Sequence, residues 1–175
     1  MKLRPIFIIL VFALLSCGAR PTHAQGIAGN WIWTSGESSP RNAYAYFRKS
    51  FSISAVPESA TIRVTADSRY ILYVNGIEVR RGPSRSHTRY RTYDTIDAAA
   101  YFQRGANVIA AVVHHYGDWT FSAQRGRAGL LVDARIVTSR GSYTIRTDDS
   151  WRALRTTAWD ADLDRINMQL GFRSL

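Results

Sequence analysis

The sequence predicts an all-β protein, an antiparallel β-sandwich of the jelly-roll type. Short segments in which apolar and polar residues alternate recur roughly every 8–15 residues along the chain. Clusters of Gly, Pro, Asn and Asp separate these segments, as expected for turns between strands. No long stretch carries the periodicity of an amphipathic helix. With 46% apolar and 12% aromatic residues, the 175-residue chain has enough apolar side chains for one packed domain.

Two early segments are expected to be strands. Residues 44–53 (YAYFRKSFSI) are aromatic and alternating. Residues 60–66 (ATIRVTA) alternate as well, with Ile62 and Val64 on one face. The proline in residues 56–58 (VPE) is expected to interrupt the chain between the two strands.

The dipeptide Asn75-Gly76 is the strongest turn signal in the chain, because both central residues of a type I′ turn need a positive φ. Residues 70–74 and 77–81 flank this dipeptide, so we expect a β-hairpin. Residues 82–84 (GPS) then open an arginine-rich loop at 85–91.

The second half of the chain predicts one short helical turn and three more strands. Residues 97–102 are expected to form the helical turn, with Asp97 as its N-cap. Residues 108–113 (VIAAVV) are all apolar, so they should form a central strand that is buried on both faces. Further strands are expected at 129–137 and 142–146.

The N-terminal segment has the pattern of a secretory signal peptide. Lys2 and Arg4 precede an apolar run at 6–15 that is too short to span a bilayer. Two ends of this signal remain open. The lipobox-like sequence LLSC would make Cys17 a lipid-modified N-terminus, whereas the small-x-small sequence THA before residue 25 suits ordinary cleavage.

Charge and cysteine content limit the partners and the chemistry. Cys17 is the only cysteine, so the domain is expected to contain no disulfide and no thiol chemistry. The net charge is +10, and about +7 without residues 1–24, which contain three basic residues and no acidic ones. Nearly all of this charge is arginine scattered over strands and loops, which favours solvated strand faces. A polyanion partner remains an alternative, and no nucleic-acid partner is expected.

No catalytic residue is predicted. His114 and His115 form the only adjacent histidine pair, and neighbours on a strand point to opposite faces, so they are not expected to bind one metal together. No metal-ligand motif, phosphate-binding glycine loop or G-x-S-x-G sequence occurs. Most aspartates lie at predicted turns, where Asp is favoured for backbone hydrogen bonding. No cofactor is therefore expected, and calcium stays an option that no motif supports.

Residues 114–119 (HHYGDW) are expected to gather polar and aromatic side chains, because they leave a buried strand and enter a loop broken by a glycine. Sugars are recognised by aromatic faces and by planar polar groups that reach the hydroxyls. The loop at 81–93 is expected either to lie at the same end or to flank a neighbouring domain. The residues expected to bind a ligand are Arg81, His114, His115, Tyr116, Asp118 and Trp119.

Several segments occur in an order and spacing that resemble a known family. They are WIW at 31–33, YFRKSF at 46–51, ADSRYILYVNG at 66–76, RGP at 81–83, YDT at 93–95 and GANVIAAVVHHYG at 105–117. Together they resemble the N-terminal β-sandwich of bacterial α-L-rhamnosidases and related glycoside hydrolases, over residues 30–155. The resemblance implies a galactose-binding-like jelly roll.

In that family the catalytic acid and base lie in a helical barrel that follows the sandwich, so the resemblance carries no catalytic residue to this chain. It implies a non-catalytic carbohydrate-binding or accessory module whose partner is a plant or bacterial glycan, rhamnose-containing glycans included. Some related sandwiches bind rhamnose with calcium, but no calcium ligands map onto this sequence. Two alternatives remain open: a truncated rhamnosidase fragment without independent function, and a basic polyanion-binding envelope protein.

The expected division of the chain follows from these points. Residues 1–24 form the signal peptide, residues 25–155 form the carbohydrate-binding-like β-sandwich, and residues 156–175 form a truncated linker or tail. The protein is expected to be secreted or periplasmic, with membrane attachment only through a lipidated Cys17.

Overall fold

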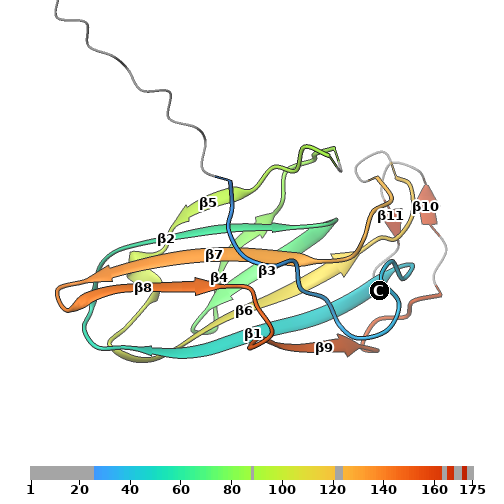
Figure 1. The fold of residues 1–175 in the computed structure, drawn as a ribbon. Coiled ribbons are helices and arrows are strands. Elements are labelled where there is room, and N and C mark those ends of the chain that lie inside the picture. The colour runs from blue at the N-terminus through green and yellow to red at the C-terminus, as the bar shows by residue number, and fades with distance from the viewer. Residues whose placement is uncertain (1–25, 88, 121–123, 163–164, 168–170, 173–175) are drawn as a thin grey trace, which may run out of the picture.

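The computed structural model describes residues 26–87, 89–120, 124–162, 165–167 and 171–172. Over these residues two antiparallel β-sheets pack face to face (Figure 1). The antiparallel β-sandwich predicted from the sequence is confirmed.

The larger sheet has five strands in the order β4-β3-β6-β1-β9. β6 lies at its centre and pairs with β1 on one side and β3 on the other. The strands are β1 (Ala43–Ile53), β3 (Arg69–Val74), β4 (Ile77–Gly82), β6 (Gly105–His115) and β9 (Arg152–Thr156).

The smaller sheet has four strands in the order β5-β2-β7-β8. They are β2 (Pro57–Ala66), β5 (Asp94–Asp97), β7 (Leu130–Thr138) and β8 (Gly141–Arg146). A separate two-stranded ladder joins β10 (Arg165–Asn167) to β11 (Gly171–Phe172).

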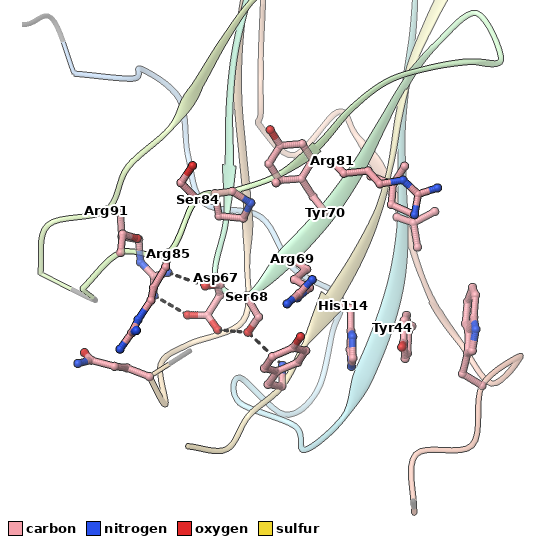
Figure 2. A pocket seen from close by; sticks show the side chains of 18 residues that line it. Tyr44, Asp67, Ser68, Arg69, Tyr70, Arg81, Ser84, Arg85, Arg91 and His114 are labelled. Carbon is pink, nitrogen blue, oxygen red and sulfur yellow. Dashed lines mark hydrogen bonds and ion pairs between the residues drawn. The ribbon is translucent and has the colours of Figure 1, made fainter. Parts of the chain in front are cut away.

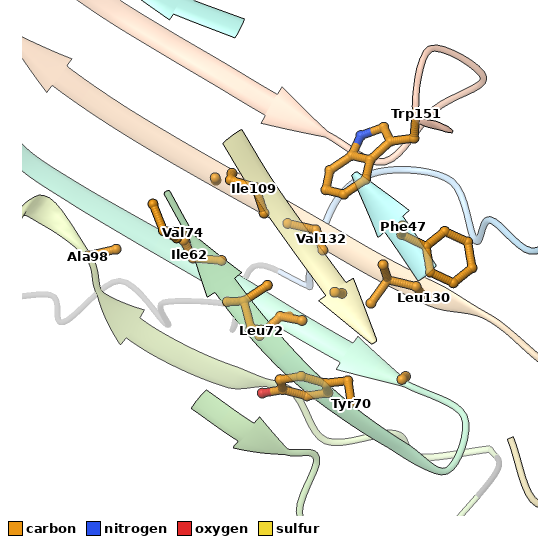
Figure 3. Close-up of a cluster of buried hydrophobic side chains, with 14 of the residues drawn as sticks. Phe47, Ile62, Tyr70, Leu72, Val74, Ala98, Ile109, Leu130, Val132 and Trp151 are labelled. Carbon is orange, nitrogen blue, oxygen red and sulfur yellow. The ribbon is translucent and has the colours of Figure 1, made fainter. Parts of the chain in front are cut away.

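Inward-facing side chains of both sheets interdigitate in one core (Figure 3). Phe47, Leu72 and Ile109 come from the larger sheet, and Ile62 and Val132 come from the smaller one. Because side chains alternate along a strand, every second residue of these strands faces this core. Each large apolar side chain contributes about 1.5–3 kcal/mol when fully buried, so the core can hold the fold without a disulfide.

The predicted hairpin at Asn75-Gly76 is confirmed, with φ angles of 51° and 84°. The asparagine does more than turn the chain. Its side-chain amide donates to Asn107 Oδ1 at 2.8 Å, and its Oδ1 accepts the backbone N–H of Val108 at 2.8 Å. These bonds fix the end of the β3–β4 hairpin against the first residues of β6.

Three details of the sequence prediction are wrong. The chain break expected at 56–58 falls earlier, because β2 already begins at Pro57. Residues 108–113 do lie in the central strand, but only one face of that strand is buried. The helical turn expected at 97–102 does form, as a 3-10 helix at Ala99–Tyr101, but its N-cap is Ala98 and not the expected Asp97.

The physical reason for the second error is the position of the larger sheet. Its inner face meets the smaller sheet, whereas nothing in the described part of the chain forms a third layer over β6. Ile109, Ala111 and Val113 therefore face the core, and Val112 and His114 face outward and are half-buried.

The sequence predicts two terminal segments outside the sandwich, a signal peptide and a tail. The predicted signal peptide at 1–24 lies outside the described residues. The tail at 156–175 is described in part, and within it Trp159 stacks on Tyr44 of β1. In the described ranges no helix has both the length and the apolar character needed to cross a membrane.

Candidate functional site

A cleft of about 610 Å³ opens on the outer face of the larger sheet, at the end where β6 finishes (Figure 2). Outward residues of β1, β3 and β6 form its floor, and residues 82–86, which run from the last residue of β4 into the next loop, form one wall. Backbone pairing explains the floor. Tyr44 on β1 pairs with His114 on β6, and His114 pairs with Arg69 on β3, so these three side chains are neighbours on one face.

The aromatic side chains of the cleft stack on one another. The ring centroids of Tyr44 and His114 are 3.9 Å apart, and those of Tyr44 and Trp159 are 4.4 Å apart, both in nearly parallel planes. Tyr116 meets His114 edge to face at 4.7 Å. Much of the ring-face area is therefore used inside the stack, and the stack offers ring edges to a ligand.

The His114 ring is held neutral. Burial is the main cause and the charges of Arg69 and His115 add to it, so that the pKa of His114 falls to about 3. Its Nε2 lies 2.8 Å from Oδ1 of Asn42. Burial raises the pKa of the Tyr44 hydroxyl, which therefore stays protonated. Both groups offer polar edges without a charge.

Most of the charged side chains that line the cleft are arginines. Arg69, Arg81, Arg85 and Arg91 all line it. Arg69 lies over the Tyr116 ring, 5.8 Å from its centroid. Arg81 makes two 2.7 Å contacts with Glu78, which stands outside the cleft.

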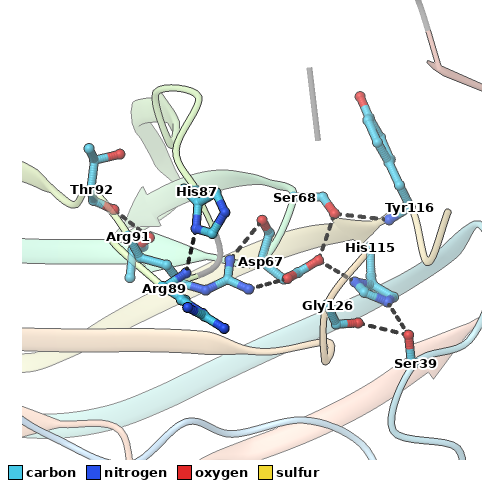
Figure 4. A network of polar contacts seen from close by, with 11 residues as sticks. Ser39, Asp67, Ser68, His87, Arg89, Arg91, Thr92, His115, Tyr116 and Gly126 are labelled. Atoms are coloured by element: carbon cyan, nitrogen blue, oxygen red, sulfur yellow. Dashed lines mark hydrogen bonds and ion pairs between the residues drawn. The ribbon is translucent and has the colours of Figure 1, made fainter. Parts of the chain in front are cut away.

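Asp67 is the single carboxylate among the described lining residues. Its side chain is 1% exposed, forms an ion pair with Arg91 at 2.5 Å and lies 2.8 Å from His115 Nδ1 (Figure 4). Ser68 Oγ donates to the same carboxylate at 2.9 Å. Burial alone would raise the pKa of Asp67, but the hydrogen bonds and charges of His115 and Arg91 outweigh burial and lower it. The carboxylate is thus ionised and fully occupied by protein donors.

Ser39, His115 and Asp67 have the connectivity of a serine-hydrolase triad, since Ser39 Oγ lies 3.5 Å from His115 Nε2. The geometry argues for a structural role. The Ser39 hydroxyl donates to the carbonyl of Gly126 at 2.7 Å, and the His115 side chain is fully buried. Neither Ser39 nor His115 lines the cleft. The network ties the segment before β1 and the loop before β7 to the end of β6.

The structure brings together three of the six predicted ligand residues. Arg81, His114 and Tyr116 line the cleft. His115 points to the other face of β6, into the Asp67 network, as the alternation of a strand requires. Asp118 and Trp119 follow in the next loop, outside the cleft lining, and Trp119 is 57% exposed.

Sequence reasoning missed several lining residues, Tyr44, Arg69 and Trp159 among them. The alternation in residues 44–53 assigns Tyr44 to one face of its strand, but it does not predict which side chains of other strands lie beside it. Trp159 lies in the segment predicted to be a tail. Of the two positions expected for the loop at 81–93, the structure shows the one at the same end as His114, since residues 82–86 form a wall of the cleft.

Across the described ranges no group of three or more His, Cys, Asp or Glu side chains is placed to hold a metal ion. Asp67, the carboxylate of the described cleft lining, already contacts three protein donor groups. The polar groups that line the cleft are arginines, ring edges and hydroxyls.

Fold and cleft together define a β-sandwich domain with a polar surface cleft on its outer face. A crystal structure of a GH78 family rhamnosidase from Bacillus sp. GL1 matches it with a TM-score of 0.76 and 39% identity, covering 84% of this chain and 15% of that one. The α-L-rhamnosidase of Streptomyces avermitilis is 28% identical over 145 residues, which are 79% of this chain and 13% of that enzyme.

A third match is the lectin of Pleurotus ostreatus in its apo form, with a TM-score of 0.59 and 28% identity over 83% of this chain and 41% of that one. No family model matches the chain. Over about 80% of its length, the chain is thus similar to GH78 α-L-rhamnosidases, as the sequence resemblance predicted. It spans 13% to 15% of the length of the rhamnosidases it matches.

Proposed function

We propose that this chain is a non-catalytic carbohydrate-binding domain of the kind that accompanies α-L-rhamnosidase catalytic domains. The observation that carries the proposal is the cleft, which the rings of Tyr44 and His114 line together with Arg69 and Arg81. Planar polar groups around an apolar floor suit the hydroxyls and C–H faces of a sugar. A volume of about 610 Å³ has room for a short oligosaccharide.

The comparisons support a sugar ligand. One matching structure is a lectin, and the rhamnosidases act on a rhamnose-containing substrate by their name. A glycan that contains rhamnose, from a plant or a bacterium, is therefore the first ligand to test.

A binding role also fits the acid–base groups of the cleft. Glycosidases use two carboxyl groups placed about 5–9 Å apart across the scissile bond. Asp67 is the one carboxylate of the described lining, and His115 and Arg91 already bind it. We propose that catalysis in a whole enzyme resides in other parts, so this chain alone should release no rhamnose from an aryl α-L-rhamnoside.

Titration calorimetry with rhamnose-containing oligosaccharides tests the proposal. Trp159→Ala removes one wall of the ring stack and should weaken binding about fivefold or more, since an aromatic contact is worth roughly 1 kcal/mol. Tyr143→Ala is the control, because Tyr143 lies on β8 of the opposite sheet. If Trp119→Ala abolishes binding while Trp159→Ala does not, the ligand sits in the loop after β6 and the cleft assignment is wrong. Flat titrations for every sugar, with and without calcium, would count against any binding role.

We also propose that the protein is exported, with or without a lipid on Cys17, because residues 1–24 carry the pattern of a signal peptide. Fractionation of expressing bacteria, followed by mass spectrometry of the N-terminus, distinguishes a lipidated Cys17 from cleavage before Gln25. Recovery of the uncleaved chain from the cytoplasm would contradict export.

A further inference from the structure

The charge of the cleft is one-sided. Four arginines and one carboxylate line it among the described residues. Two of these arginines are already paired, Arg91 with Asp67 and Arg81 with Glu78, which stands outside the cleft. The carboxylate, Asp67, is 1% exposed, forms an ion pair with Arg91 and contacts His115, so a ligand in the cleft does not reach it. His114, at the centre of the floor, is neutral and cannot offset or add to this charge.

Arg69 is the arginine best placed to meet a ligand. It stands beside His114 in the sheet register, and its guanidinium lies 5.8 Å from the centroid of the Tyr116 ring. In the described part of the chain it contacts this ring and forms no ion pair. Figure 2 shows Arg69 in the middle of the site, with Arg85 and Arg91 on one side and Arg81 on the other. A guanidinium held over a ring keeps its donors free and loses little conformational entropy on binding.

The ring stack favours the same kind of ligand. Tyr44 is stacked between His114 and Trp159, so its faces are occupied. A neutral sugar gains affinity mainly by covering ring faces, and this cleft offers mostly edges and guanidinium groups. Guanidinium groups match the planar, bidentate geometry of a carboxylate.

We infer that the cleft selects acidic saccharides, meaning sugars that carry a carboxylate, and that Arg69 binds that carboxylate directly. This inference rests on the proposed function and narrows its ligand class. The sugar ring lies along the polar edges of Tyr44 and His114, while its acidic group turns toward Arg69.

A pair of oligosaccharides that differ only in charge tests the inference. The probes are a trimer of galacturonic acid and the same trimer with its carboxyl groups methyl-esterified, titrated into the full chain at about 50 and 200 mM salt. The acid should bind about tenfold or more tightly than the ester, since a charge-assisted hydrogen bond is worth roughly 1.5–3 kcal/mol. Arg69→Gln should remove most of this difference, because it should weaken binding of the acid far more than binding of the ester.

Arg104→Gln is the matched control, because it removes the same charge from an exposed site that does not line the cleft. Equal affinity for acid and ester would overturn the inference. If neutral rhamnose-containing sugars still bind in that case, the proposed function stands. A sulfated oligosaccharide and a short single-stranded DNA complete the series. If DNA binds as tightly as the acid, or if Arg104→Gln weakens binding as much as Arg69→Gln does, the cleft is a general polyanion surface and the inference fails. Because the acid–ester comparison uses the unmodified chain, it decides the question even if Arg69→Gln does not fold.

Discussion

Replacement of Asp67 by asparagine should destabilise the fold strongly. The carboxylate is 1% exposed and holds Arg91, which is 20% exposed, and the fully buried His115. Removal of one partner from a buried ion pair costs about 3–5 kcal/mol, because the remaining charge stays desolvated. An asparagine keeps the shape and one acceptor, so we expect a loss of about 3 kcal/mol at pH 7. For a chain of this size, that loss lowers Tm by roughly 10 °C.

Urea denaturation followed by tryptophan fluorescence measures this loss. Asp133→Asn is the matched control, since Asp133 also pairs with an arginine, but its partner Arg146 is 52% exposed. An exposed pair is worth about 1 kcal/mol or less, so the control should stay close to the unmodified chain. Equal, small effects of the two substitutions would refute the argument that burial makes the Asp67 network contribute more to stability than the exposed pair does.

Three other predictions concern pH, packing and a turn. The folded-state pKa of His114 is about 3, below its ordinary value of 6.5, so the unfolded chain binds the extra proton first. Stability should therefore fall as the pH drops from about 6.5, by up to roughly 1.4 kcal/mol per pH unit. The urea midpoint of His114→Gln should fall less steeply with pH than that of the unmodified chain. Parallel plots of midpoint against pH for the two proteins would contradict this. Leu72→Ala should cost about 2–5 kcal/mol in the same assay, because Leu72 is fully buried between the sheets, and a loss below about 1 kcal/mol would contradict the core assignment. Gly117→Ala should lower Tm by roughly 5 °C or more, because a Cβ there would lie 2.2 Å from the Pro40 carbonyl oxygen and φ is +63°; an unchanged melting curve would show that the loop can shift.

Sequence patterns predicted the strands well where alternation and turn chemistry agreed. Residues 60–66 alternate strictly and lie in β2, and Asn75-Gly76 forms the expected hairpin. β9 was missed because its sequence, RALRT, pairs only at the sheet edge and is almost wholly exposed. An exposed edge strand carries no apolar alternation to detect.

The cleft could be predicted only in part, for a physical reason. Tyr44, Arg69 and His114 are far apart in the chain, and they become neighbours through the register of three strands. Alternation tells which residues share a face of one strand, but pairing between strands depends on the whole fold. The segment 114–119 was singled out because a buried strand ends there, and His114 and Tyr116 do line the cleft. The Asp67–Arg91 ion pair joins a turn to a loop, and no local sequence pattern predicts it.

The most direct test of a carbohydrate-binding cleft is to locate the ligand by NMR. Amide spectra of the isotope-labelled chain are recorded during titration with whichever oligosaccharide binds tightest. Binding in the cleft predicts that the shifts concentrate at the backbone amides of Arg69, Ser84 and His114, while those of β8 on the opposite sheet stay in place. Shifts that gather around Trp119, or that spread evenly over exposed arginines, would show that the sugar binds elsewhere on this protein.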